Sequence, residues 1–223
     1  MVKEEEKPRS AMGFTVERLN ALSDGVFAVA ITLLVVSIAI PTIRGTVTSS
    51  KLAHGLAELW PHFFAYGLSF VIIGMFWVSH HALFSAIRKV DRGLIWLNML
   101  YLLLIVFMPY PTSILALFGQ TSVAVILYAA VLGAAALVQA LLGFYATHKR
   151  RLVDDEFEKR EADQYIRHSL ETSGVFLLSI VIAVFNSSAA QFFWILLFFV
   201  QLADGLIFKK GTRKAKTKEQ EVA

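Results

Sequence analysis

Long apolar segments alternate with short charged ones along this chain of 223 residues. An α-helix rises about 1.5 Å per residue, so roughly 20 predominantly apolar residues are needed to cross the hydrocarbon core of a bilayer. Six segments approach that length, and they cover residues 22–40, 62–87, 94–118, 123–145, 173–185 and 192–208. The last two are short, and only the polar run Asn186-Ser187-Ser188 separates them. The pattern predicts an all-α, polytopic membrane protein with six transmembrane helices.

Composition supports a membrane protein over a soluble one. Apolar residues make up 57% of the chain and charged residues 17%, against about 45–50% and about 25% in soluble domains. A soluble helical bundle would not confine its charges to the gaps between six consecutive segments. The absence of cysteine from the sequence excludes disulfides, thiolate nucleophiles and cysteine-ligated metals. The hydrophilic residues 1–10 do not resemble a signal peptide, so we expect the first helix to stay in the mature protein.

The positive charges indicate topology. The net charge is +4, and 19 of the 21 Lys and Arg residues fall before the first helix, in the loop 88–92, in the loop 148–167 or in the tail; Arg44 and Lys51 lie on the other side. The positive-inside rule then places both termini in the cytoplasm, as expected for a multi-pass protein of the plasma membrane. Because the Lys and Arg residues occur in short clusters between apolar segments, they do not form an exposed face that could bind nucleic acid. We therefore predict no nucleic acid partner.

The same reasoning divides the chain into a cytoplasmic segment 1–17, a membrane domain 18–208 and a basic cytoplasmic tail 209–223. Acidic and basic residues alternate over 154–163, which predicts a short solvated helix, and the tail has the composition of a disordered segment. For the loop 148–167 a topological role is favoured over ligand binding.

Polar residues inside apolar segments are candidates for function, because their burial in a membrane is costly without a partner. Three clusters reach a similar depth near the predicted cytoplasmic face, and their members are Arg18, Ser23, Asp24, His80, His81 and Asn98. We expect one inter-helix network in which Asp24 accepts a hydrogen bond from Arg18, a histidine or Asn98.

Enzymatic chemistry is not predicted. Adjacent residues on a helix point about 100° apart, so His80 and His81 are poorly placed to bind one metal ion, and an H-E-x-x-H pattern is absent from the sequence. The sequence also has no G-x-S-x-G elbow and no phosphate-binding glycine loop. Ser23, Ser69 and Ser79 together with the histidine pair leave a serine hydrolase formally open. We predict no cofactor and no metal site.

The first predicted helix carries a stripe on one face. Val29, Thr32, Leu33 and Val36 follow the spacing i, i+3, i+4 and i+7, which places them on one side of a helix. This side either packs on neighbouring helices or faces a central axis shared by several copies. In the second case the copies of Thr32 would form a ring of hydroxyls around the axis. The copies of the other three residues would form apolar rings, which can gate ions by dewetting.

Several motifs resemble a known family. The run from Arg18 to Asp24 is similar to the R-x-x-x-F-S-D motif that opens helix one of the endosomal and lysosomal potassium channel family and its prokaryotic relatives. The resemblance continues to residue 112, with Leu22 standing where the family has Phe and Val29 where Ile or Leu is common. The further matching motifs are Phe76-Trp77-x-x-His80-His81, Asp91, Leu94-x-Trp96-Leu97-Asn98 and Pro109-Tyr110-Pro111-Thr112.

The resemblance implies a potassium-permeable channel that lacks the T-V-G-Y-G filter. It also implies a homotetramer, because the chain has one six-helix unit, and it implies that helix one lines a central pore. By position, Val29, Leu33 and Val36 would form the pore constriction and Thr32 the layer that favours potassium. The polar network named above would support the pore helices. The implied partners are potassium ions, further copies of the chain and the lipid bilayer.

Two other functions remain open at this level. In a proton-coupled secondary transporter, Asp24 and the His80-His81 pair would form a proton relay, and Pro109 and Pro111 would break the third helix. The sequence shows no inverted repeat, which argues against that class. A membrane scaffold without transport is the second alternative. Small residues at positions 129, 133 and 136 predict close packing of the fourth helix in each case.

Overall fold

A computed structural model describes residues 15–148, 152–153 and 159–194. Within these ranges all regular elements are helical. In chain order they are α1 (Val16–Leu33), the 3₁₀ helix η1 (Leu34–Ser37), α2 (Ser49–Glu58), α3 (Trp60–Ala86), α4 (Arg92–Phe107), α5 (Pro109–Phe118), α6 (Ser122–Thr147) and α7 (Lys159–Phe185). Residues 187–194 are helical as well.

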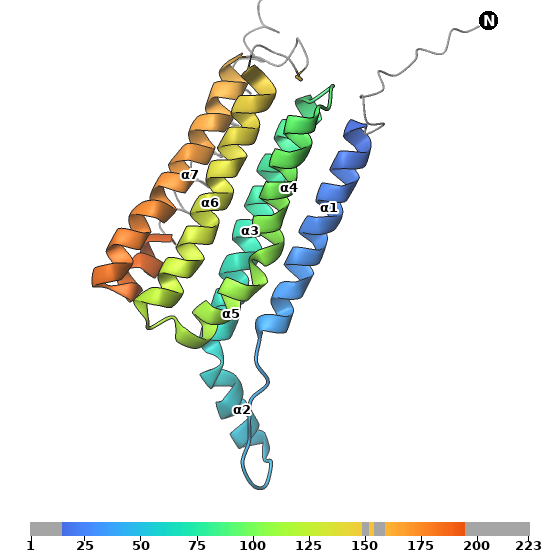
Figure 1. Cartoon of the computed structure of the whole chain (residues 1–223). Helices are drawn as coiled ribbons and strands as arrows, with labels where there is room; N and C mark the ends of the chain where they lie inside the picture. Colours follow the sequence, from blue (N-terminus) through green and yellow to red (C-terminus); the bar gives the residue numbers. More distant parts are fainter. Residues whose placement is uncertain (1–14, 149–151, 154–158, 195–223) are drawn as a thin grey trace, which may run out of the picture.

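The long helices lie side by side in one bundle (Figure 1). The helices α6 and α7 form one side, α3 and α4 the middle, and α1 the other side, while α2 projects beyond the bundle. We call the end where α1 begins the Arg88 end and the opposite end the α2 end. Because consecutive spans alternate in direction, all the predicted cytoplasmic loops meet at the Arg88 end.

Five helices in the described ranges are long and apolar enough to cross a membrane, and they are Val16–Ser37, Trp60–Ala86, Arg92–Phe118, Ser122–Thr147 and Arg160–Phe185. These agree with the first five predicted segments. The predicted sixth segment, 192–208, lies outside the described residues beyond position 194. The prediction of an all-α membrane fold is confirmed.

The boundaries differ from the predicted ones in three places. The first helix begins at Val16, six residues before the predicted start, because Thr15 caps it by accepting a hydrogen bond from the backbone N–H of Arg18 at 3.4 Å. The fifth span extends back to Lys159 and includes residues 159–163 of the stretch expected as a separate linker helix, whose residues 154–158 lie outside the described ranges. The short helix α2 was not predicted, because its apolar pattern is too brief to stand out.

The third span is divided at Met108. The prolines at 109 and 111 carry no N–H to donate within a helix, so α4 ends and α5 begins there. The Met108 carbonyl accepts from the backbone N–H of Thr112 at 3.1 Å and from its hydroxyl at 2.8 Å, so helical hydrogen bonding resumes directly after the break. The span therefore continues across the bilayer as two helical parts.

The packing of α6 against α7 confirms the predicted role of its small residues. Ala129, Gly133 and Ala136 are fully buried on α6. A Cβ at Gly133 would lie 3.4 Å from a methyl carbon of Leu177 on α7. Glycine and alanine thus let the two backbones approach closely, which is the usual basis of helix packing in membranes.

At the Arg88 end two loops are joined. Ile87 and Val153 form an isolated antiparallel bridge, and the backbone N–H of Arg88 donates to the carbonyl of Leu152 at 2.8 Å. Tyr145 on α6 donates to Asp91 at 2.8 Å, and Asp91 also caps α4. These contacts hold α3, α4 and α6 in a defined register at this end of the bundle.

Candidate functional site

Helix α1 has a buried face and an exposed face. Helix α1 packs on α3 and α4, and its buried residues are Leu19, Ser23, Phe27 and Ala30. Leu34 is buried in η1, which packs on α3 and α5. On the other side Val29 is 49% exposed, Leu33 43% and Val36 76%, and Thr32 is exposed as well. The predicted stripe therefore does not pack inside the single chain, which excludes the interpretation that it is part of the bundle core.

The exposed residues follow a second regularity. Leu22, Gly25, Val29 and Thr32 on α1 are separated alternately by three and four residues and are all exposed. Val36 is exposed as well, but it lies beyond the end of α1 in the 3₁₀ helix η1, so the α-helical spacing holds only as far as Thr32. This is the spacing of the a and d positions with which helices pair in coiled coils. Leu33 lies beside this row. The row is suited to contact with parallel copies of α1.

The hydroxyl of Thr32 is oriented by its own helix. It lies 2.9 Å from the carbonyl of Ala28 and 3.0 Å from that of Val29, and it donates to these backbone oxygens. A hydroxyl has one proton and two acceptor lone pairs. With the proton directed at the helix backbone, the oxygen can act only as an acceptor toward the exposed side, as a cation ligand requires.

A buried hydrogen-bonded triad connects three helices. Ser23 on α1 donates to the Leu19 carbonyl at 2.9 Å and accepts from the Asn98 amide on α4 at 3.0 Å. The Asn98 oxygen lies 2.9 Å from Nε2 of His80 on α3. Because that oxygen only accepts, Nε2 carries the proton and donates. All three side chains are buried, so the triad ties α1 to the bundle.

Aromatic rings hold the histidine of the triad. The His80 ring stacks on Phe84 with ring centroids 4.1 Å apart and on Tyr101 with centroids 5.5 Å apart. Phe27 of α1 lies 5.7 Å from the same ring. These rings surround His80 with apolar groups inside the bundle.

Asp24 has a different partner from the expected one. Its carboxylate accepts a hydrogen bond from the indole N–H of Trp77 at 2.8 Å, and not from Arg18, a histidine or Asn98. The reason is angular: Ser23 faces the bundle, whereas Asp24, one residue and about 100° further on, is exposed. Arg18 and His81 are exposed too, and the His81 ring lies 5.8 Å from that of Trp77.

The structure therefore brings Ser23, His80 and Asn98 together and leaves Arg18, Asp24 and His81 on the surface of the chain. Trp77 was overlooked as a polar partner, although it stands in the motif Phe76-Trp77-x-x-His80-His81. An indole N–H is a donor that usually finds an acceptor when it is near one, and this was the available signal.

A second polar layer, nearer the α2 end, was also missed. The hydroxyl of Ser69 on α3 lies 2.8 Å from that of Thr112 on α5 and 2.9 Å from that of Tyr128 on α6. It joins the broken third span to its neighbours directly beyond the break. Single hydroxyl residues in apolar runs carry little sequence signal, so this layer is visible only in the packed bundle. Among the described residues no group of three or more potential metal ligands is present.

Comparison with known proteins gives consistent matches. Residues 18–109 match the family described as "Endosomal/lysosomal potassium channel TMEM175". A potassium channel of Streptomyces collinus is 40% identical over 141 residues, which are 61% of this chain and 67% of that protein. A potassium channel of Chamaesiphon minutus is 35% identical over 169 residues, which are 74% of this chain and 83% of that protein.

A solved structure is similar as well. The crystal structure of a lysosomal potassium-selective channel TMEM175 homolog from Chamaesiphon minutus superimposes with a TM-score of 0.74 at 31% sequence identity. The match covers 84% of this chain and 97% of that one. Sequence and structure therefore agree over most of the bundle.

Proposed function

Because this chain belongs to the TMEM175 family, we propose that it forms a potassium-permeable cation channel. The observation that carries the proposal is the exposed row on α1, which has the spacing of a helix–helix seam, is apolar apart from one oriented hydroxyl, and runs along a membrane span. The family is one of ion channels, so the chain is not an enzyme.

The proposed assembly is a homotetramer with α1 innermost. One chain supplies one α1, and a single helix cannot enclose an axis, so the pore needs several copies. The exposed row on α1 is the surface that four copies would present to one another. Phe27 and Leu34 on the opposite face anchor the helix to its own bundle.

In this assembly Val29, Leu33 and Val36 form the constriction and Thr32 the layer that favours potassium. Apolar rings exclude water from a narrow pore and so oppose ion passage. The Thr32 oxygens, acting as acceptors, offer dipoles to a partly dehydrated cation, and potassium loses its water at lower cost than sodium. The hydroxyl orientation at Thr32 supports this assignment.

The polar residues support the pore helix. The Ser23–Asn98–His80 triad positions α1 within each chain, and Trp77 positions the Asp24 carboxylate. Arg18, Asp24 and His81 are exposed in the single chain. We assign them to the polar layer where neighbouring copies meet, since charged groups at membrane depth require partners.

For topology we propose that both termini and the Arg88 end face the cytoplasm of a plasma membrane, on the strength of the Lys and Arg distribution. The channel domain then comprises residues 18–208, between the cytoplasmic segment 1–17 and the tail 209–223. The proton-coupled transporter is less well supported: Asp24 is bonded to Trp77 and His80 to Asn98, so the described contacts do not link the two into a relay.

Ion flux in reconstituted vesicles tests the proposal. Vesicles containing the protein are loaded with potassium, diluted into sodium, and followed with a membrane-potential dye. A channel produces an inside-negative potential without a coupled ion, whereas a proton-coupled transporter changes the internal pH with potassium flux. Protein-free vesicles and Val36→Lys, which places a charge in the proposed constriction, serve as controls. No potential change from correctly folded protein would refute the channel.

A further inference from the structure

The first membrane span changes its helix type before it ends. The α-helix α1 stops at Leu33, and the 3₁₀ helix η1 follows over Leu34–Ser37. A 3₁₀ helix has three residues per turn, so side chains three residues apart lie above one another. In an α-helix the same side chains are offset by about 60°. The change of helix type therefore decides which side chains of η1 continue the exposed face of α1.

Burial along this stretch has the three-residue period of a 3₁₀ helix. Leu34 is fully buried. Ile31, three residues before it, and Ser37, three residues after it, are half-buried. These three residues therefore share one side, and η1 packs on α3 and α5. The opposite side of η1, which carries Val35 and Val36, is exposed.

The exposed side of η1 continues that of α1 in two columns. Val35 follows Thr32 by three residues and is 55% exposed. Val36 follows Leu33 by three residues and is 76% exposed. With the geometry of η1, Val35 lies nearly above Thr32 and Val36 nearly above Leu33. The α-helical spacing predicted from the sequence instead aligned Val36 with Thr32 and left Val35 outside the stripe.

Two hydrogen bonds hold η1 in this form. The backbone N–H of Ile38 donates to the Val35 carbonyl at 3.1 Å, which is the bond between residues i and i+3 of a 3₁₀ turn. The Ser37 hydroxyl donates to the Leu34 carbonyl at 2.6 Å and so satisfies an acceptor at the helix end. Backbone bonds and the burial of Leu34 therefore fix the direction of Val35 and Val36.

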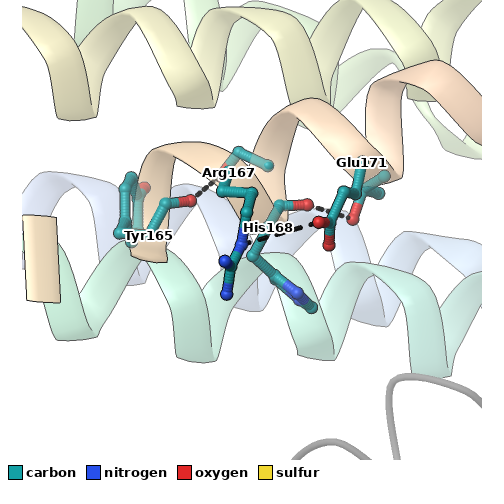
Figure 2. A network of polar contacts seen from close by, with 6 residues as sticks. Tyr165, Arg167, His168 and Glu171 are labelled. Carbon is teal, nitrogen blue, oxygen red and sulfur yellow. Dashed lines mark hydrogen bonds and ion pairs between the residues drawn. The ribbon is translucent and has the colours of Figure 1, made fainter. Parts of the chain in front are cut away.

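The surroundings of this stretch carry no charge along the chain. The sequence has no Asp, Glu, Lys or Arg between positions 25 and 43. The ion pair of Arg167 with Glu171, at 3.6 Å, lies on α7 (Figure 2). The helices α3 and α4 lie between α7 and α1 (Figure 1). On its own helix, the polar group nearest to the exposed side of Val35 is therefore the hydroxyl of Thr32.

We propose that Val35 is a further pore-lining residue, whose copies form an apolar ring next to the Thr32 layer on the side of the α2 end. The inference rests on the proposed channel with α1 innermost. At a rise of about 2 Å per residue, the ring lies about 6 Å from the Thr32 oxygens along the axis. Apolar rings exclude water from a narrow pore and oppose ion passage. Val35 thus adds to the constriction and limits conductance.

Cysteine accessibility tests the position of Val35, and the sequence contains no native cysteine to interfere. Full-length channels carrying Val35→Cys are recorded in planar bilayers before and after a small, positively charged methanethiosulfonate reagent is applied from the α2 end. The reacting species is the thiolate, which forms in water and not in lipid. We expect the attached charge to reduce the potassium current at least fivefold, as it should in the positive control Thr32→Cys.

Phe107→Cys is the matched control for depth. Ser23 on α1 and Asn98 on α4 are hydrogen-bonded at 3.0 Å, and the two helices run in the same direction. Thr32 lies nine residues after Ser23, and Phe107 lies nine residues after Asn98. The two positions therefore share one depth. Phe107 is exposed on α4, outside the proposed pore, so the reagent should leave its current unchanged.

The outcomes separate this inference from the proposed function. Block of Thr32→Cys without block of Val35→Cys would overturn the inference and leave the channel with α1 innermost in place. If neither variant is blocked while both carry potassium current, α1 does not line the pore, and both proposals fail.

A second variant tests the apolar ring without a reagent. Val35→Thr keeps a similar shape and adds a hydroxyl, which lets water enter the ring. We expect the single-channel conductance to rise at least twofold. Val106→Thr makes the same change at an exposed position of α4 and should leave the conductance unchanged. Equal conductance in Val35→Thr and the parent channel would contradict a role of Val35 in the constriction.

Discussion

Asn98 is the central member of the buried triad, and its replacement by leucine isolates the contribution of that triad. The substitution keeps a similar volume and removes both the donor to Ser23 and the acceptor for His80. Ser23 still donates to the Leu19 carbonyl, so it loses only an acceptor function. The His80 N–H loses its partner in a closed aromatic environment, and this loss dominates.

The magnitude can be bounded from two sides. A buried donor without an acceptor costs about 1–3 kcal/mol. Hydrogen bonds between membrane helices average about 0.6 kcal/mol, with a maximum near 1.7 kcal/mol, because the separated helices also find partners. For the two bonds of Asn98 we therefore expect Asn98→Leu to lower the free energy of unfolding by about 1–3 kcal/mol.

A rescue variant separates the triad from general packing. In Asn98→Leu combined with His80→Phe, both polar partners are gone and the phenyl ring can keep the stack between Phe84 and Tyr101. Replacing both partners by apolar groups of similar shape is nearly neutral, so stability should return to within about 1 kcal/mol of the parent. Leu103→Phe is the matched control, because it introduces a phenyl ring at an exposed position of α4 and leaves the triad intact.

Thermal and detergent denaturation of the purified protein, followed by helix content and by the oligomer fraction on size exclusion, provides the readout. If the double variant is less stable than Asn98→Leu alone, the polar triad is not what the substitution disturbs. The same result would indicate that His80 stabilises the bundle through its ring contacts only.

Three further predictions concern the proposed pore and the Asp24 contact. Thr32→Val keeps the shape and removes the oxygen, so reversal potentials in mixed potassium and sodium should show a reduced preference for potassium; an unchanged preference with normal current would place the hydroxyl away from the ions. Leu33→Ala widens an apolar ring and should raise conductance or leak in single-channel recordings without lowering selectivity, and a loss of selectivity would contradict the division of roles. Asp24→Ala should lower the tetramer fraction in native mass spectrometry more than Trp77→Phe, which removes only one donor to the carboxylate; equal effects would mean that the indole bond is the whole contribution of Asp24.

The broken third span shows what a local sequence pattern can and cannot predict. The hydrophobic pattern predicted one segment over 94–118, and the two prolines were used only in the transporter alternative. The helix α4 nevertheless ends at Phe107 before Pro109, because proline lacks an N–H to donate. The hydrophobic pattern also indicated the five spans found among the described residues. It could do so because a membrane-crossing helix is one run of consecutive apolar residues. It overlooked α2, whose ten residues are too few for a membrane-scale pattern.

The polar residues of α1, α3 and α4 mark the boundary between sequence and tertiary structure. The sequence by itself determined that Ser23, Asp24, His80 and Asn98 lie at one depth, because depth follows from the rise per residue. Only the packed bundle decided that Asn98 forms hydrogen bonds with Ser23 and His80, whereas the Asp24 carboxylate accepts one from Trp77. Hydrogen-bond partners depend on the rotation and register of each helix against its neighbours, and a change of about 100° between adjacent residues moves a side chain from the core to the surface. That rotation is set by the summed packing of all the helices, which no single segment of the sequence contains.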